Sequence, residues 1–99
     1  MALFAISFLL EDGSDYNDRY AALVKAIENA ADGDVWSETA SFYLVNSTKN
    51  SVNLKDEIIA AVSLQDGDKV LVINLSKTKG HATSGLTKKT LFKKLIEQR

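Results

Sequence analysis

Two carboxylates in an acidic turn are the side chains best placed for metal chemistry. Glu11 and Asp12 directly follow an apolar stretch, and Asp15 and Asp18 come within the next few residues. Carboxylates at a strand end are oxygen ligands suited to a hard divalent cation. Their spacing lacks the glycine at position six and the glutamate at position twelve of a calcium-binding loop. We favour the plainer interpretation, an ordinary turn followed by a helix start.

The lysines near the carboxyl end are a second candidate group, for binding phosphates. Residues 1–76 hold five basic and twelve acidic residues, whereas residues 77–99 hold seven basic residues against Glu97 alone. A basic tail on a helix suits phosphates or an acidic partner. We favour a solvated helix face that meets the acidic body of the same molecule or of a second copy. The candidate nucleic-acid contacts are Lys77, Lys79, Lys88, Lys89 and Lys93.

The loop Lys77–Gly85 could cradle an anion, because its glycines allow close backbone approach. It lacks the Gly-x4-Gly-Lys-Ser/Thr pattern of a Walker loop, so we interpret it as a flexible connection. His81 in this loop is the side chain expected to titrate near neutrality, and we expect it to be solvated. Neither Ser37 nor Ser41 has a histidine nearby in sequence, so a nucleophilic triad is unsupported.

Two aromatic residues, Trp36 and Tyr43, could stack nucleic-acid bases if a sheet exposed them. The Lys/Arg-Gly-Phe/Tyr-Gly/Ala-Phe-Val-x-Phe/Tyr signature of RNA-recognition modules is absent from the sequence. We therefore expect both residues to pack in a core or in a dimer interface.

The composition excludes several classes of protein. The chain has 99 residues, 45% hydrophobic and 25% charged, which is typical of one globular domain. Without cysteine it has neither disulfides nor thiolate sites, and one histidine excludes a multi-histidine metal site within one chain. No apolar run approaches the ~20 residues that span a bilayer. Because the apolar start has no signal-peptide features, we expect a cytoplasmic protein with no membrane partner.

Hydrophobic patterning predicts four strands that would position these residues. Ala2–Leu10 and Val70–Leu75 are apolar at both alternate sets of positions, which indicates interior strands covered on both faces. Two shorter strands are expected near Val35–Glu38 and Ser41–Asn46, joined by a tight bend.

Three helices are expected between and after these strands. Asp15–Ala31 has apolar residues at 3.6-residue spacing, and Gly33 would supply its left-handed stop. A second helix would run up to the turn Gln65–Asp68, and a third would follow the loop at Gly85. The expected caps are Ser14 or Asp15 for the first helix, Asn53 with Asp56 for the second, and Thr87 for the third, with Leu86 and Leu91 as a hydrophobic staple.

The order β-α-β-β-α-β followed by a helix predicts an α+β fold, the ferredoxin-like split βαβ sandwich with an extra C-terminal helix. Residues 1–76 would form the ferredoxin-like core, and residues 77–99 the basic loop and C-terminal helix of the same single domain. Right-handed crossovers place the first and last strands side by side in the centre. Both main helices then lie on one face. The other, apolar face needs a cover from the C-terminal helix or a second copy, which predicts a homodimer.

Several segments together resemble a known family. They are AISFLL with GSDYNDRYAALVKAI, then WSETASFYLVNST, then LKDEIIAAV with DGDKVLVINL, and the late SGL. In order and spacing they are similar to the small SinR-like proteins grouped with VapD and with the second core CRISPR-associated protein. The resemblance covers about the first 85 residues. It implies a ferredoxin-like homodimer that acts as a metal-dependent endonuclease or as a nucleic-acid scaffold.

In that family a strand-one aspartate from each subunit faces the dimer axis and shares a cation. The family's aromatic-Asp-aliphatic triplet falls on Phe8, Leu9 and Leu10, so leucine stands at the aspartate position. Leucine ligates no metal, and Glu11 or Asp12 would replace the aspartate only if the strand shifted its register. The resemblance therefore speaks for the fold more strongly than for the chemistry.

Three functional hypotheses follow from the residues and the resemblance. We favour a non-catalytic homodimeric module that associates with nucleic acid or with a protein and needs no cofactor. The alternatives are a Mg²⁺- or Mn²⁺-dependent endonuclease using Glu11 and Asp12 at the dimer axis, and a partner protein of the toxin–antitoxin type.

Overall fold

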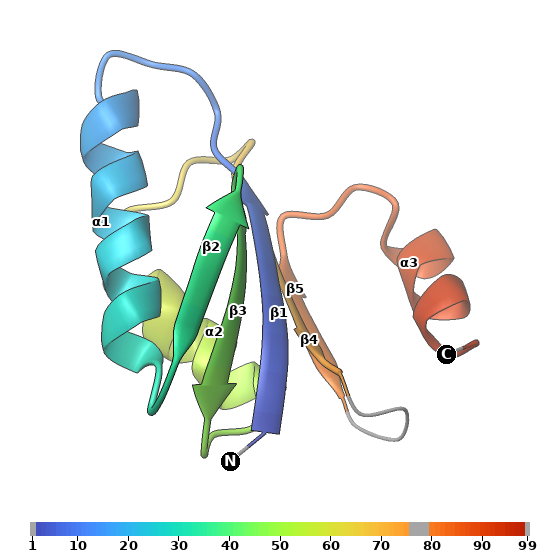
Figure 1. Ribbon diagram of the computed structural model, residues 1–99. Helices are drawn as coiled ribbons and strands as arrows, with labels where there is room; N and C mark the ends of the chain where they lie inside the picture. Colours follow the sequence, from blue (N-terminus) through green and yellow to red (C-terminus); the bar gives the residue numbers. More distant parts are fainter. Residues whose placement is uncertain (1, 76–79, 99) are drawn as a thin grey trace.

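A five-stranded antiparallel sheet forms the centre of the computed structural model, which describes residues 2–75 and 80–98 (Figure 1). The strand order is β2-β3-β1-β4-β5. The first four strands have the order of the split βαβ arrangement, which confirms the predicted α+β ferredoxin-like class, and β5 adds a fifth strand beside β4. The strands are β1 (Ala2–Leu9), β2 (Val35–Thr39), β3 (Phe42–Ser47), β4 (Lys69–Asn74) and β5 (His81–Ser84).

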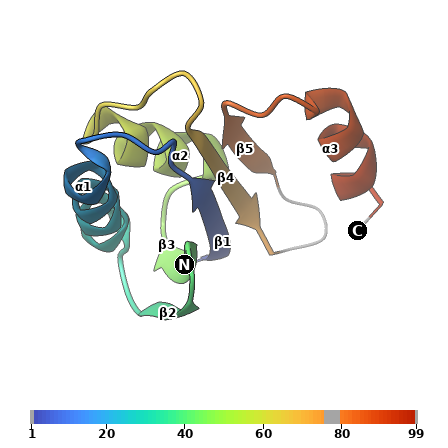
Figure 2. The ribbon, with the colours of Figure 1, turned by 90° about the horizontal axis from the view of Figure 1, so that it is seen from above.

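Three helices flank the sheet: α1 (Tyr16–Ala30), α2 (Ser51–Ala60) and α3 (Lys89–Ile96). Figures 1 and 2 show α1 and α2 on one face of the sheet and α3 on the opposite side, next to β4 and β5. The prediction that β1 and β4 are adjacent interior strands is confirmed, since β1 pairs with both β3 and β4.

The core lies between the sheet and the pair α1 and α2. Alternation along β1 turns Phe4, Ile6 and Phe8 toward these helices, where Phe4 and Ile6 are completely buried. Leu23 and Ile27 of α1 meet them at helical spacing. The remaining completely buried apolar side chains are Val45, Leu54, Ile58, Val70 and Val72.

The predicted loop Lys77–Gly85 is partly wrong, because its second half is strand β5. Ile73 pairs with His81 and Val70 pairs with Ser84. The polar sequence hid this strand, since Ala82 is the only buried residue of β5. Gly85 ends β5 with φ +83, a conformation that L side chains rarely adopt. Lys77 and Lys79 lie outside the described residues.

The start and end of α1 differ from the predictions. Asp15 occupies the N-cap position, but its carboxylate makes no capping hydrogen bond and instead accepts one from Arg19 Nε at 3.2 Å. Ala31, in an extended conformation, ends the helix, so the prediction that Gly33 supplies a left-handed stop is wrong.

The later helices also begin away from their predicted caps. Asn50, not Asn53, caps α2, because its side chain accepts a 2.8 Å hydrogen bond from the Asn53 N–H. The helix ends at Ala60, before the turn 65–68. Lys88 occupies the N-cap of α3, so Thr87 is not the cap.

Candidate interaction surface on the open face of the sheet

The face of the sheet that is turned away from α1 and α2, here called the open face, carries a row of apolar residues across β2, β3, β1 and β4 that ends at His81 of β5. Strand pairing places Trp36 beside Leu44, Leu44 beside Ala5, Ala5 beside Ile73, and Ile73 beside His81. This transverse row contains no aspartate, glutamate, lysine or arginine. When one face of an antiparallel sheet is in water, the side chains on that face are usually polar.

Leucines on either side of the row extend this apolar surface. Leu3 and Leu75 are neighbours across β1 and the end of β4, joined by a 3.0 Å hydrogen bond from Leu75 N to Leu3 O, and 43% and 48% of their surfaces are exposed. Leu9, at the opposite end of β1, pairs with Lys69 and is 58% exposed. Contiguous apolar surface of this kind marks interaction sites.

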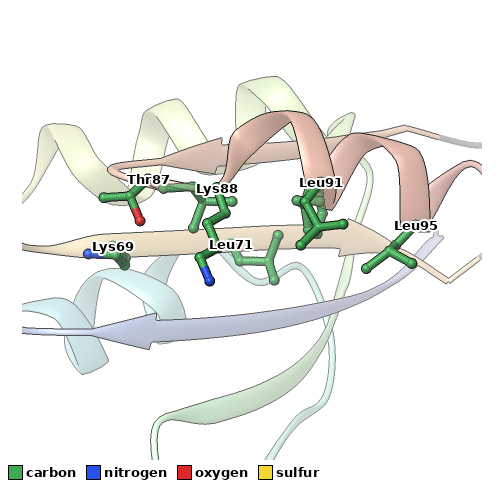
Figure 3. A pocket seen from close by; sticks show the side chains of 8 residues that line it. Lys69, Leu71, Thr87, Lys88, Leu91 and Leu95 are labelled. Atoms are coloured by element: carbon green, nitrogen blue, oxygen red, sulfur yellow. The ribbon is translucent and has the colours of Figure 1, made fainter.

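The helix α3 covers only one margin of the open face. Its Phe92 ring packs edge-on against His81, with ring centroids 5.2 Å apart. Between α3 and β4 lies a groove of about 350 Å³ (Figure 3). The predicted C-terminal cover is thus partial, because α3 stands beside β4 and leaves the sheet around β1 and β3 bare.

Trp36 and Tyr43 end on opposite sides of the sheet. Tyr43 is buried and stacks on Phe8 with ring centroids 6.2 Å apart, so its predicted core packing is confirmed. Burial, with the nearby Tyr20 phenol, raises the pKa of Tyr43. Trp36 lies on the open face, 40% exposed, with its ring 6.4 Å from that of Phe42.

The acidic turn is a structural joint between β1 and the segment before β4. The Glu11 N–H donates a 2.6 Å hydrogen bond to Asp68 Oδ1, and the Glu11 carbonyl accepts one from Arg19 Nη2. The Glu11 carboxylate lies against Gly67, where a larger residue would meet it. This placement turns Glu11 toward the 65–68 turn.

Asp68 is the anchor of this joint, and its side chain is completely buried. Burial by itself would raise the pKa of Asp68, but hydrogen bonds from the Gln65 and Glu11 N–H groups and from Arg19 outweigh it and lower the pKa. Burial works to lower the pKa of Arg19, yet its hydrogen bonds to Asp15 and Asp68 raise it above the ordinary value. Both groups stay charged at neutral pH.

In the part of the chain that the structure describes, the predicted carboxylate site at Glu11 and Asp12 does not become a group of three metal-ligating side chains. Asp12 is exposed at the turn, while Glu11 folds back against Gly67. Among residues 2–75 and 80–98, no three carboxylate or histidine side chains gather closely enough to hold a metal ion. Leu9 points from β1 to the open face and is mostly exposed.

The candidate lysines divide between two parts of α3. Lys88 lines the groove at its N-cap position. Lys89 and Lys93 are exposed and stand one helical turn apart. Helix α3 has no acidic residue in its first turn. Within the described chain, no helix combines the length and apolarity needed to cross a bilayer.

The fold and this surface define an α+β, ferredoxin-like domain with one bare sheet face. No family model, curated protein or solved structure matches the chain significantly. The open face was foreseen from the doubly apolar strands. The groove was not, because it depends on where α3 stands, although the Leu91, Phe92 and Leu95 stripe was a signal for it.

Proposed function

We propose that this chain is a non-catalytic interaction module of the cytoplasm that works as a homodimer through the open face. The observation that carries the proposal is the transverse row of Trp36, Leu44, Ala5, Ile73 and His81. A second copy carries the same row, and in a two-fold symmetric dimer the same surface of each subunit contacts the other.

The shape of the open face supports a packed interface. Ala5 and Ser7 are small residues on the central strand, while Phe42 and Leu44 stand on one side of them and Leu71 and Ile73 on the other. Small side chains on β1 are thus flanked by larger ones on both neighbouring strands. Burial of apolar area contributes about 25 cal/mol per Å². Burying Trp36 and the exposed leucines of the open face between two copies would therefore favour association.

Two observations support the absence of catalysis. Leu9 stands at the position where the resembled family carries its strand-one aspartate, and leucine has no group that binds a metal or transfers a proton. Glu11, the nearest acid, is engaged through its backbone with Asp68 and Arg19, and its carboxylate rests against Gly67. Its placement serves the joint between β1 and β4.

The test is the molar mass in solution, measured by light scattering across a hundredfold range of protein concentration. We expect the mass of a dimer of the 10.8 kDa chain. Leu3→Glu would place a charge on the open face and shift the mass toward the monomer. Val52→Glu is the matched control, because Val52 is an apolar residue of α2, equally exposed, on the other side of the sheet. A wild-type monomer at every concentration would refute the proposal.

A nucleic-acid partner is a second candidate, favoured by the exposed Lys89 and Lys93 on α3. Their charges would meet phosphates, and binding would weaken steeply with salt. The measurement is the affinity for short RNA and DNA duplexes at 50 and 200 mM salt, with wild type and Lys89→Gln/Lys93→Gln. Equal affinities of the two proteins would remove these lysines as the contact.

A further inference from the structure

We infer that the groove between α3 and β4 is a binding site for an amphipathic monocarboxylate, a carboxylate that carries an acyl chain of medium length. The groove borders the surface of the proposed homodimer and shares Leu71 with it, whereas none of the transverse-row residues lines the groove. Its basis is the division of the groove into an apolar part and a cationic end.

The apolar part of the groove comes from both elements that border it. Leu71 of β4 forms one side, and residues of α3 and the segment before it form the other. Leu91 and Leu95 are each about half exposed there, so the groove is open to a ligand from solvent. The volume of about 350 Å³ falls within the range of small-molecule sites. The apolar residues that line it are Leu71, Leu86, Leu91, Phe92 and Leu95.

The cationic end is formed by Lys69, Thr87 and Lys88. Figure 3 shows Lys69 and Thr87 at one end of the groove, Lys88 next to them on the side of Leu71, and Leu91 and Leu95 toward the other end. No acidic residue lines the groove, and among the described residues neither lysine pairs with a carboxylate. Two ammonium groups and one hydroxyl offer hydrogen-bond donors and positive charge to an anionic head group.

The length of the groove sets the length of the acyl chain. At 1.5 Å per residue, the helix axis advances about 10 Å between Lys88 and Leu95. An extended chain of about eight carbons covers this distance, with its carboxylate at the lysines and its methyl end near Leu95. A cationic amphiphile of the same length would bring its charge against Lys69 and Lys88, so the site discriminates by sign of charge.

The experiment is a titration of the ¹⁵N-labelled full chain with sodium octanoate below its micelle concentration, followed by amide chemical shifts. We expect saturable shifts at Leu71, Thr87 and Leu91, with little change at Trp36 on the far strand. Acetate, which lacks the tail, and octylammonium, which reverses the charge, should each bind at least about tenfold more weakly. Higher salt should weaken octanoate binding.

Two double variants distinguish binding in the groove from a general attraction of octanoate to the lysines of the basic tail. Lys69→Gln/Lys88→Gln should weaken octanoate binding about tenfold, whereas Lys89→Gln/Lys93→Gln, which removes two lysines that do not line the groove, should leave it nearly unchanged. Leu95→Asn, at a half-exposed position, should also weaken binding.

Three outcomes would overturn the inference. The first is the absence of octanoate-induced shifts at the groove, and the second is equal binding of octylammonium. The third is that the chemical shifts of the groove amides change with protein concentration and not with octanoate. A second copy of the chain, and no carboxylate, would then occupy the groove. Because the mass of the Leu3→Glu protein is measured separately, failure here leaves the homodimer proposal standing or falling on its own.

Discussion

Arg19 Nη1 donates a 2.6 Å hydrogen bond to Asp68 Oδ2, and this buried pair joins α1 to the segment before β4, 49 residues further along the chain. The same carboxylate accepts hydrogen bonds from the Glu11 and Gln65 N–H groups. The joint therefore holds the end of β1, the start of α1 and the start of β4 in one place. Removing one partner would leave the others buried and unpaired.

We expect Asp68→Asn to destabilise the protein strongly at neutral pH. The amide has the shape of the carboxylate but no charge to offset Arg19, so the melting temperature should fall by about 10 °C or more. Circular dichroism melts check this, with Asp66→Asn as the control in the same turn, since Asp66 is exposed. A variant that melts with the wild type would contradict the assigned role.

The lowered pKa of Asp68 also predicts a dependence of stability on pH. Because its folded pKa lies below the unfolded value of about 3.9, the ionised carboxylate stabilises the native state above that value. This contribution is lost as the pH falls through the folded pKa. The difference in free energy of unfolding between wild type and Asp68→Asn should therefore be constant from pH 7 to about 5 and shrink below pH 4. Urea titrations at each pH measure it, and a difference independent of pH would contradict the assignment.

Two glycines near this joint should respond differently to alanine. Gly85 has φ +83, and an added Cβ would meet the Asp68 backbone carbonyl, so Gly85→Ala should lower the melting temperature by about 10 °C. Gly67→Ala is the matched control, because its Cβ would meet only the end of the flexible Glu11 side chain, which can swing aside. Equal melting temperatures for the two variants would show that the Gly85 contact is not as close as described.

Self-association predicts that thermal stability depends on protein concentration. A partner that binds only the folded chain stabilises it by mass action, so the wild-type melting temperature should rise with concentration. The Leu3→Glu protein should melt at a temperature that does not vary with concentration. Differential scanning calorimetry over a hundredfold range provides the measurement, and a wild-type melting temperature that stays constant would count against a dimer.

Metal-dependent cleavage of nucleic acid is expected to be absent. Purified wild-type protein with Mg²⁺ or Mn²⁺ should leave labelled RNA and DNA intact, because Glu11 lies against Gly67 and Leu9 has no group that binds a metal. Glu11→Gln/Asp12→Asn serves as the control for contamination. Cleavage by wild type that disappears in this double variant would establish the nuclease alternative.

The fold class followed from local patterns in the sequence. Ala2–Leu10 and Val70–Leu75 are apolar at both alternate sets of positions, and only interior strands require that pattern. The order of strands and helices then admitted few topologies, and the observed order β2-β3-β1-β4 is one of them. The predictions that differ from the structure concern one polar strand and the helix ends: β5 forms the second half of the predicted loop, Asn50 caps α2 in place of Asn53, and α1 ends without Gly33.

The candidate sites were less predictable, because side chains far apart in sequence meet there. From the sequence, Glu11 is a candidate metal ligand. In the structure its N–H donates to Asp68 and its carboxylate lies against Gly67, in the 65–68 turn. In sequence Lys88 is indistinguishable from other surface lysines, and only the fold places Lys69 beside the same groove. No spacing rule connects residues from separate elements.

By itself, the sequence determined the α+β class, the two central strands and the apolar row on the open face. Successive side chains of a strand point to opposite faces, so the pattern of apolar residues shows which faces are buried. Only the tertiary structure decided that Arg19 and Asp68 pair, that β5 joins the sheet, and that α3 stands beside β4 with a groove between them. These features depend on packing between distant segments, and local periodicity carries no information about which distant segments meet.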